Sequence, residues 1–226
     1  MDPHLSSIAA LAWCRELGLA DDALSSGGLV TKVADTLSTV RVLDVGDTVA
    51  VVGPAPAVSA VAALSTRSDE GAVRAAAGGF AARTEVLCLC PEWTDAVRLK
   101  DPLISHDTAD LAELVRRCPP DDSSEVGADV PDRAFVLLDD DHQPLAVAGY
   151  RELQSLLADV RVLTTPENRR LGLGATVATL CTHDALDAGL IPQWRARRDN
   201  LSARGLAAVC GYVEWGTLIT VRTSAG

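Results

Sequence analysis

The 226-residue sequence contains no apolar run near the roughly 18 residues that a helix needs to cross a bilayer. Its first residues also lack a basic segment followed by an apolar one, so we expect no signal peptide. Together these two absences predict a cytoplasmic protein that has no membrane partner.

Lysine is nearly absent, with Lys32 and Lys100 standing against many arginines. Acidic residues outnumber basic ones by 31 to 20, which gives a net charge of -11. That charge argues against nucleic acid or an anionic membrane as the main partner. An anionic ligand would need a local basic cluster, which the arginine-rich C-terminal third supplies. The preference for Arg over Lys is also typical of bacterial genomes of high GC content, although this is only an association.

The sequence lacks the cysteine spacing of a zinc site. Cys88 and Cys90 would share one face of a strand, and the other cysteines lie in apolar contexts. We expect buried, reduced thiols, with disulfides or metal binding as alternatives. The acidic segment from Asp139 to His142 fits a solvated hairpin turn, and a single cluster with one histidine is weak support for a metal site. We therefore predict no metal. The six cysteines are at positions 14, 88, 90, 118, 181 and 210.

The chain divides by pattern into two parts. Residues 1–93 show a helix at 5–19, a strand at 48–52, a helix from 58 and a strand at 85–90, without a catalytic motif. Residues 94–226 begin with a short strand at 97–99 and a helix capped by Ser105, followed by a hairpin over 134–150. We predict an α/β fold with a mixed sheet, in which a small N-terminal α/β unit (1–93) precedes a larger domain (94–226).

The most informative stretch is a strand, a glycine-rich loop and a helix in direct succession. Residues 160–163 are β-branched and apolar, and good helix formers run from Ala175 to about residue 188. Unpaired amides at the start of such a helix, together with its dipole, attract anions. Gly172 and Gly174 allow the backbone to approach a bulky anion, while Arg169 and Arg170 add positive charge. In isolation, the two arginines would more often be solvated turn residues.

Several landmarks in residues 97–222 resemble the GNAT superfamily of acyl-CoA-dependent N-acyltransferases. The segment from Arg169 to Gly174 matches the family's Gln/Arg-x-x-Gly-x-Gly/Ala loop. Downstream, residues 192–194 (Pro-Gln-Trp), Asn200, residues 206–207 (Leu-Ala) and residues 211–212 (Gly-Tyr) fit its later pattern. The combination is similar to bacterial members that include antibiotic-inactivating acetyltransferases. Residues 1–93 lie outside the resemblance.

The resemblance implies a splayed central strand pair and a site for acetyl-CoA as co-substrate. The loop amides would hold the CoA pyrophosphate, and the edge of the preceding strand would pair with the pantetheine arm and polarise the thioester carbonyl. Asn200 is similar to a CoA-contacting asparagine, although as a helix cap it would need no ligand. The residues implied in cofactor binding are Val162, Leu163, Thr164, Arg169, Arg170, Leu171, Gly172, Leu173, Gly174, Ala175, Thr176 and Asn200.

The catalytic residues are less well marked. Many relatives carry a tyrosine as general acid where this chain has Ala207, which leaves Tyr212 as a substitute although its counterpart usually packs in the core. Asp159, near a position where some relatives have glutamate, is the candidate base, and a solvated strand-end carboxylate is the alternative. Glu152, Tyr150 and His142 are further candidates without positional support.

Two functions remain open at this stage. The first is an N-acetyltransferase that moves an acetyl or other acyl group from CoA to a primary amine of a small molecule by direct attack. The acidic net charge would suit a cationic acceptor. The second is a non-catalytic module that binds CoA as a ligand or sensor, or that supports a protein partner. A homodimer is one assembly that the resemblance allows, and the sequence leaves the oligomeric state open.

Overall fold

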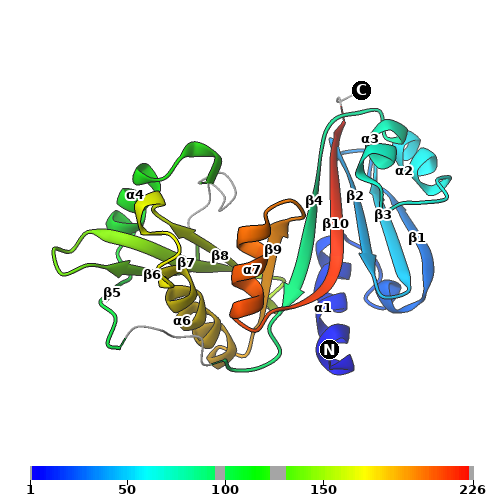
Figure 1. Ribbon diagram of the computed structural model, residues 1–226. Helices are drawn as coiled ribbons and strands as arrows, with labels where there is room; N and C mark the ends of the chain where they lie inside the picture. The colour runs from blue at the N-terminus through cyan, green and yellow to red at the C-terminus, as the bar shows by residue number, and fades with distance from the viewer. Residues whose placement is uncertain (1, 95–99, 123–130, 224–226) are drawn as a thin grey trace. The chain divides into compact units, whose positions relative to one another are not determined.

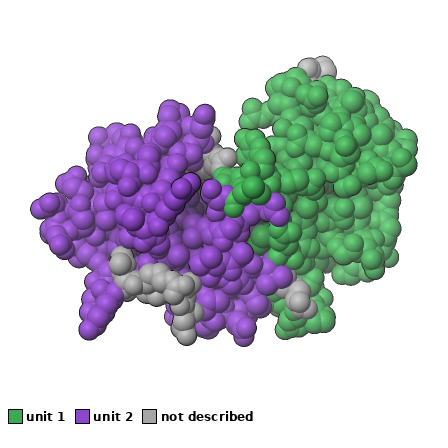
Figure 2. All heavy atoms as spheres, viewed as in Figure 1, with its two compact units in different colours: residues 1–88, 196–201, 214–226 green, residues 89–195, 202–213 purple. Residues whose placement is uncertain are grey.

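The computed structural model describes residues 2–94, 100–122 and 131–223 (Figure 1). These residues form two compact units, each treated separately below. Unit 1 contains residues 1–88, 196–201 and 214–226, and unit 2 contains residues 89–195 and 202–213 (Figure 2). The units do not follow the predicted division at residues 93/94, because a short segment and the final strand of the chain belong to unit 1. The strand predicted at 97–99 lies outside the described residues.

Unit 1 is built on strands in the order β1, β3, β2, β10, β4. β2 and β3 form an antiparallel hairpin, β1 pairs in parallel with β3, and β10 pairs antiparallel with β2. Figure 1 shows β10, in red, alongside β2 and β4. The strand bounds are β1 Gly28–Val33, β2 Thr39–Val45, β3 Thr48–Gly53, β4 Gly79–Leu89 and β10 Val213–Thr223.

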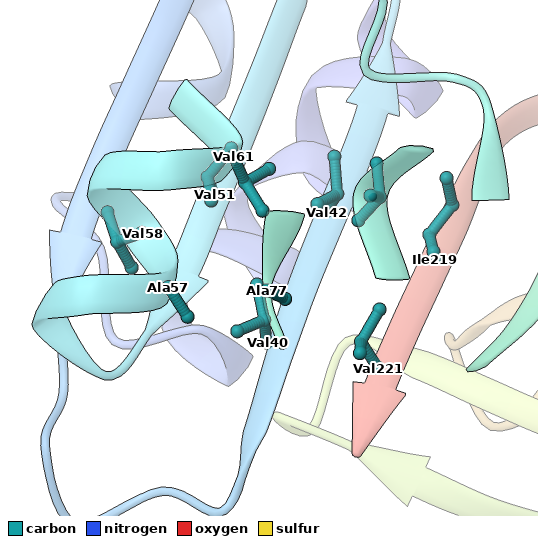
Figure 3. Packing of buried hydrophobic residues seen from close by; sticks show 10 residues of the cluster. Val40, Val42, Val51, Ala57, Val58, Val61, Ala77, Ile219 and Val221 are labelled. Atoms are coloured by element: carbon teal, nitrogen blue, oxygen red, sulfur yellow. The ribbon is translucent and has the colours of Figure 1, made fainter. Parts of the chain in front are cut away.

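Helices cover both faces of this sheet. Val58 and Val61 of α2 pack against Val40 and Val42 of β2 and against Val221 of β10, in one buried cluster (Figure 3). Because side chains alternate along a strand, Arg41 points to the opposite face. There its guanidinium pairs with Glu16 of α1 at 3.4 Å. The helical elements of unit 1 are α1 Pro3–Glu16, the 3-10 turn Ala23–Ser25, α2 Ala55–Ala62 and α3 Glu70–Ala76.

Unit 2 has strands in the order β9, β8, β7, β6, β5. β6, β7 and β8 form an antiparallel meander, whereas β8 and β9 are parallel and are connected through α6. The strand bounds are β5 Ile104–Ser105, β6 Arg133–Leu138, β7 Pro144–Leu153, β8 Leu157–Thr164 and β9 Ile191–Arg197. The helical elements are α4 Thr108–Arg117, the 3-10 turn η2 Pro166–Asn168, α6 Leu173–Asp187 and α7 Leu201–Val209.

The two faces of this sheet carry different helices. Val147 of β7 and Leu163 of β8 pack with Leu114 of α4 in one buried cluster. On the other face, the Tyr150 hydroxyl donates to the Asp184 carboxylate of α6 at 2.8 Å. This mixed α/β arrangement agrees with the predicted fold class.

The helix predicted to be capped by Ser105 begins later than expected. α4 begins at Thr108, and the side chain of Asp107 accepts a hydrogen bond from the Ala109 amide as its N-cap. Ser105 instead ends β5 and accepts from the Asp107 amide. A carboxylate is as good a cap as a hydroxyl, and Ser105 and Asp107 both lie near the start of the helix, so the predicted cap is two residues early.

All six cysteines are free and buried, as predicted. Among the described residues, no helix combines the length and apolar character needed to span a membrane.

Candidate acyl-CoA site

The glycine loop leaves a row of backbone amides without acceptors. α6 begins at Leu173, two residues before the predicted start, and the Thr176 amide donates to the Gly172 carbonyl to close its first turn. In the described structure, the amides from Arg170 to Ala175 have no hydrogen-bond partner. Six consecutive donors at a helix N-terminus form a site of positive potential without any side-chain charge.

Left-handed backbone conformations shape this loop. Gly172 caps α6 with a φ of 82°, and Arg170 also has a positive φ of 64°. Glycine adopts this region at little cost, whereas a side chain at position 172 would be strained. The geometry supplies the physical reason for glycine at this position of the motif.

Gly174 brings the first turn of α6 close to the end of β8. A Cβ atom at this position would lie 3.1 Å from Oγ1 of Thr164 and 3.3 Å from a methyl group of Leu206 in α7. Both approaches are tighter than ordinary van der Waals contact. The second glycine of the motif is therefore a packing requirement, which joins α6, α7 and the end of β8.

The end of β8 presents an open edge. Its parallel pairing with β9 runs from Leu157↔Ile191 to Val160↔Trp194, whereas β8 itself continues to Thr164. The Thr165 amide donates to the Leu145 carbonyl of the neighbouring strand β7, and bonding alternates along an antiparallel pair. The Leu163 amide consequently donates toward β7, while the amides of Val162 and Thr164 point to the open side. This edge is the splay that the resemblance implied.

The two loop arginines have different surroundings. Arg169 is held by an ion pair to Asp122 at 2.6 Å, and its Nε donates to the Thr164 carbonyl at 3.3 Å. Arg170 is exposed and has no partner in the described chain. Of the two predicted cations, Arg170 is the one whose charge is not already matched by a carboxylate.

Several contacts hold the start of the loop in place, and no sequence motif indicates them. Thr165 is fully buried, and both its amide and its hydroxyl donate to the Leu145 carbonyl. Arg117 of α4 pairs with Glu167 at 2.8 Å and donates to the Pro144 carbonyl. The Glu167 amide and Arg117 together lower the pKa of the Glu167 carboxyl. Arg117 and Asp122 are distant in sequence from the loop and belong to no motif, so no local pattern would have indicated them.

The Asp159 carboxylate lies among cationic and amide donors. It pairs with Arg161 at 3.0 Å and with Arg195 at 3.2 Å, and it accepts a hydrogen bond from the Gln193 side-chain amide at 3.2 Å. Alternation along β8 puts its side chain on the same face as Leu163, which is the α4 face. These contacts are those of an ion-paired structural carboxylate, and its role as a base stays a prediction.

Tyr212 is buried, with 5% of its surface exposed. Its hydroxyl shares a 2.7 Å hydrogen bond with Thr182 of α6, and its ring meets Trp194 edge-on. Burial raises the pKa of this phenol well above its usual value. The environment is that of a core residue, although no contact tests the predicted acid role. Ala207, where relatives carry the tyrosine, is also buried.

Asn200 directly precedes α7 and belongs to unit 1, whereas the glycine loop belongs to unit 2. Its own amide donates to the Arg197 carbonyl at 3.0 Å. The remaining predicted cofactor residues lie together in unit 2, on β8, in the loop and in the first turn of α6. Among the described side chains, no group of three or more His, Cys, Asp or Glu is placed to hold a metal ion.

Comparison with solved structures identifies the fold. The chain superposes on a structure assigned to the GNAT acetyltransferases from Novosphingobium aromaticivorans with a TM-score of 0.50 at 18% identity, covering 65% of this chain and 67% of that one. A functionally unknown conserved protein from Staphylococcus epidermidis gives 0.51 at 15% identity, covering 69% and 68%. An acetyltransferase of the GNAT family from Colwellia psychrerythraea gives 0.49 at 16% identity, covering 65% and 59%.

The chain thus spans 59–68% of the length of these three structures. A sequence search of curated proteins found no match. The profile of the acetyltransferase (GNAT) family matches residues 102–212, which include β8, the glycine loop, α6 and α7. Residues 102–212 therefore match the acetyltransferase (GNAT) family and resemble a domain of that family.

Proposed function

We propose that the protein is an acyl-CoA-dependent N-acetyltransferase that transfers an acetyl group from acetyl-CoA to a primary amine of a small molecule. The observation that carries this proposal is the row of six amides from Arg170 to Ala175 at the start of α6, which have no hydrogen-bond partner among the described residues. Such a row suits the pyrophosphate of CoA, because it offers donors and the helix dipole together. Arg170 adds a charge beside it.

In this proposal the open edge of β8 binds the rest of the cofactor. The Val162 and Thr164 amides would pair with the pantetheine arm, and one of them would donate to the thioester oxygen as charge develops on it. Leu163 contributes by packing rather than by its amide. Asn200 would contact CoA in addition to preceding α7.

The reaction would be a direct attack by the amine nitrogen on the thioester carbon. A C–N bond forms, the C–S bond breaks, and the CoA thiolate leaves with a proton taken from solvent or from a protein acid. Positioning of the two substrates would provide most of the acceleration. Asp159 or a water molecule would take the amine proton, and Tyr212 remains the candidate acid. No metal takes part in this scheme, and we expect it to operate in the cytoplasm of a bacterium, with a homodimer as one possible assembly.

The central experiment compares two glycines that flank the same helix. Gly172 and Gly189 both have positive φ, 82° and 76°, at opposite ends of α6. Replacing either by Glu imposes a similar backbone strain of about 1–2 kcal/mol. Isothermal titration calorimetry should show that Gly172→Glu abolishes CoA binding while Gly189→Glu retains it. Normal CoA affinity in Gly172→Glu would show that the loop does not hold the cofactor.

A non-catalytic CoA-binding module is the second candidate. It is favoured by Ala207 at the acid position and by the buried, hydrogen-bonded hydroxyl of Tyr212. Release of free thiol from acetyl-CoA with a panel of amines separates the two functions. Saturable, amine-dependent thiol release excludes the non-catalytic module, whereas tight CoA binding without turnover of any amine supports it.

A further inference from the structure

Arg117, in the last turn of α4, joins two elements that lie 27 and 50 residues further along the chain. Its Nη1 donates to the Pro144 carbonyl at the start of β7 at 3.1 Å, and its Nη2 donates to Oε1 of Glu167 in η2 at 2.8 Å. Only 29% of the Arg117 side chain is exposed, so this guanidinium is largely enclosed by its partners. A single side chain therefore connects α4, β7 and η2, all within unit 2.

The start of β7 holds the loop through two successive carbonyls. Thr165 is attached directly to the Leu145 carbonyl, through its amide at 3.0 Å and its hydroxyl at 3.2 Å. Glu167 is attached indirectly to the Pro144 carbonyl, because Arg117 donates to both. These two connections fix η2 to the sheet of unit 2.

η2 leads directly into the row of amides at the start of α6. It ends at Asn168, and Arg169 alone separates it from Arg170, the first residue of the row. The direction in which the row points consequently depends on how η2 is held. Donors that are fixed before binding lose less conformational entropy when the ligand arrives, so a firmly held η2 favours affinity.

Glu167 carries a charge that opposes the binding of an anion nearby. Its pairing with Arg117 offsets that charge and uses the carboxylate as the point at which η2 is attached. From this arrangement, and resting on the proposed acyl-CoA function, we infer that Arg117 is a positioning residue, which acts through Glu167 and the Pro144 carbonyl to preform the amide row for CoA.

Two substitutions separate positioning from charge. Arg117→Lys keeps the cation, but one ammonium nitrogen replaces two nitrogens that each serve a different acceptor. Glu167→Gln removes a negative charge near the anion, so electrostatics alone would tighten CoA binding, whereas loss of positioning weakens it. Both variants should raise the KM for acetyl-CoA and the Kd for CoA about three- to tenfold, with kcat nearly unchanged. The double variant should be no weaker than the weaker single variant, because both substitutions remove the same contact.

The same helix supplies matched controls. Arg116 and Glu113 form an exposed ion pair on α4 that has no printed contact with the loop. Arg116→Lys and Glu113→Gln should therefore leave the affinity for CoA unchanged. Wild-type affinity in both Arg117→Lys and Glu167→Gln, or tighter binding in Glu167→Gln, overturns the inference.

A measurement on the ligand-free protein keeps this inference distinguishable from the proposed function. NMR relaxation of the backbone amides from Arg170 to Ala175 reports their mobility without CoA. These amides should become more mobile in Arg117→Lys than in the wild type or in Arg116→Lys. Failure of the wild type to bind CoA would contradict the proposed function, whereas unchanged amide mobility in Arg117→Lys would contradict the positioning role itself.

Discussion

At the scale of single residues, the charge beside the glycine loop depends on Asp122, a carboxylate that lies outside the loop motif. Asp122 pairs with Arg169 and matches one of the two cations beside the unpartnered amides. Both side chains are partly exposed, with 44% of the Arg169 side chain and 37% of the Asp122 side chain accessible. An exposed pair of this kind contributes little to stability, and its main effect is on the local potential.

Asp122→Asn should therefore tighten CoA binding by about two- to fivefold, because the charge of Arg169 would no longer be matched by a carboxylate. Calorimetry at low ionic strength measures this change, and about 0.5 M salt should reduce it because exposed charges are screened. In the background of Arg169→Gln, the same substitution should have no such effect. Equal or weaker binding in Asp122→Asn would show that the ion pair positions the loop instead.

Because the thiols are buried, we expect the folded protein to lose stability at alkaline pH. Burial raises the pKa of Cys210 to about 11 and also raises the pKa of Cys90. Between about pH 9 and 11 the unfolded chain releases these protons while the folded chain keeps them, so the free energy of unfolding falls as pH rises. Each unit of pKa difference corresponds to about 1.4 kcal/mol.

Urea denaturation of the wild type and Cys210→Ala at pH 8 and pH 10.5 measures this effect. The alanine variant starts less stable, because it loses buried sulfur, but its stability should decline less between the two pH values. An equal decline in both proteins would mean that Cys210 does not titrate in this range.

At the scale of elements, neighbouring residues at the open edge of β8 have two different roles, one toward the open side and one toward β7. The Val162 amide faces the open side, whereas the Leu163 amide bonds toward β7 and its side chain is buried. Proline has no amide hydrogen, so at position 162 it removes the donor that faces the open side, and at position 163 it removes the donor that bonds to β7.

Val162→Pro should weaken CoA binding by about 1–3 kcal/mol, the typical contribution of a lost partner for a polar group, with a modest effect on folding. Leu163→Pro should instead lower the melting temperature sharply, because it breaks a ladder bond and disturbs the core. Thermal denaturation and calorimetry on both variants distinguish these outcomes. If Val162→Pro binds CoA normally, the edge does not hold the pantetheine arm.

Much of this element-level architecture follows from local sequence patterns. Val160 to Leu163 predicts a strand from its β-branched residues, and the glycines after it predict a loop and a helix start, because these preferences act within a few residues. The partners of the loop are different. Arg117 and Asp122 contact it from about 50 residues away, and such contacts depend on tertiary packing that no local pattern encodes.

At the scale of the whole molecule, the sequence boundary and the compact units differ because residues 196–201 and most of β10 belong to unit 1. A division at 93/94 follows composition and motif, but β10 lies between β2 and β4 in the sheet of unit 1. Nothing in residues 213–223 indicates that partner, since an apolar strand fits many sheets equally well. The predicted domains therefore remain a proposal about family relationships rather than about independent folding.

An isolated fragment of residues 1–93 should fail to fold, since it lacks the strand that separates β2 from β4. Joining residues 213–223 to this fragment through a flexible linker should restore a dispersed NMR spectrum and cooperative unfolding. A well-folded 1–93 fragment would indicate that β10 is dispensable for unit 1.

The late position of β10 also has a consequence for synthesis in the cell. A ribosome adds about 5–20 residues per second, so on the order of ten seconds separate the emergence of β4 from that of β10. Throughout that interval the nascent N-terminal segment exposes strand edges that no other part of the new chain can yet complete. The protein is consequently expected to require chaperone protection during translation, and slower synthesis should favour its aggregation.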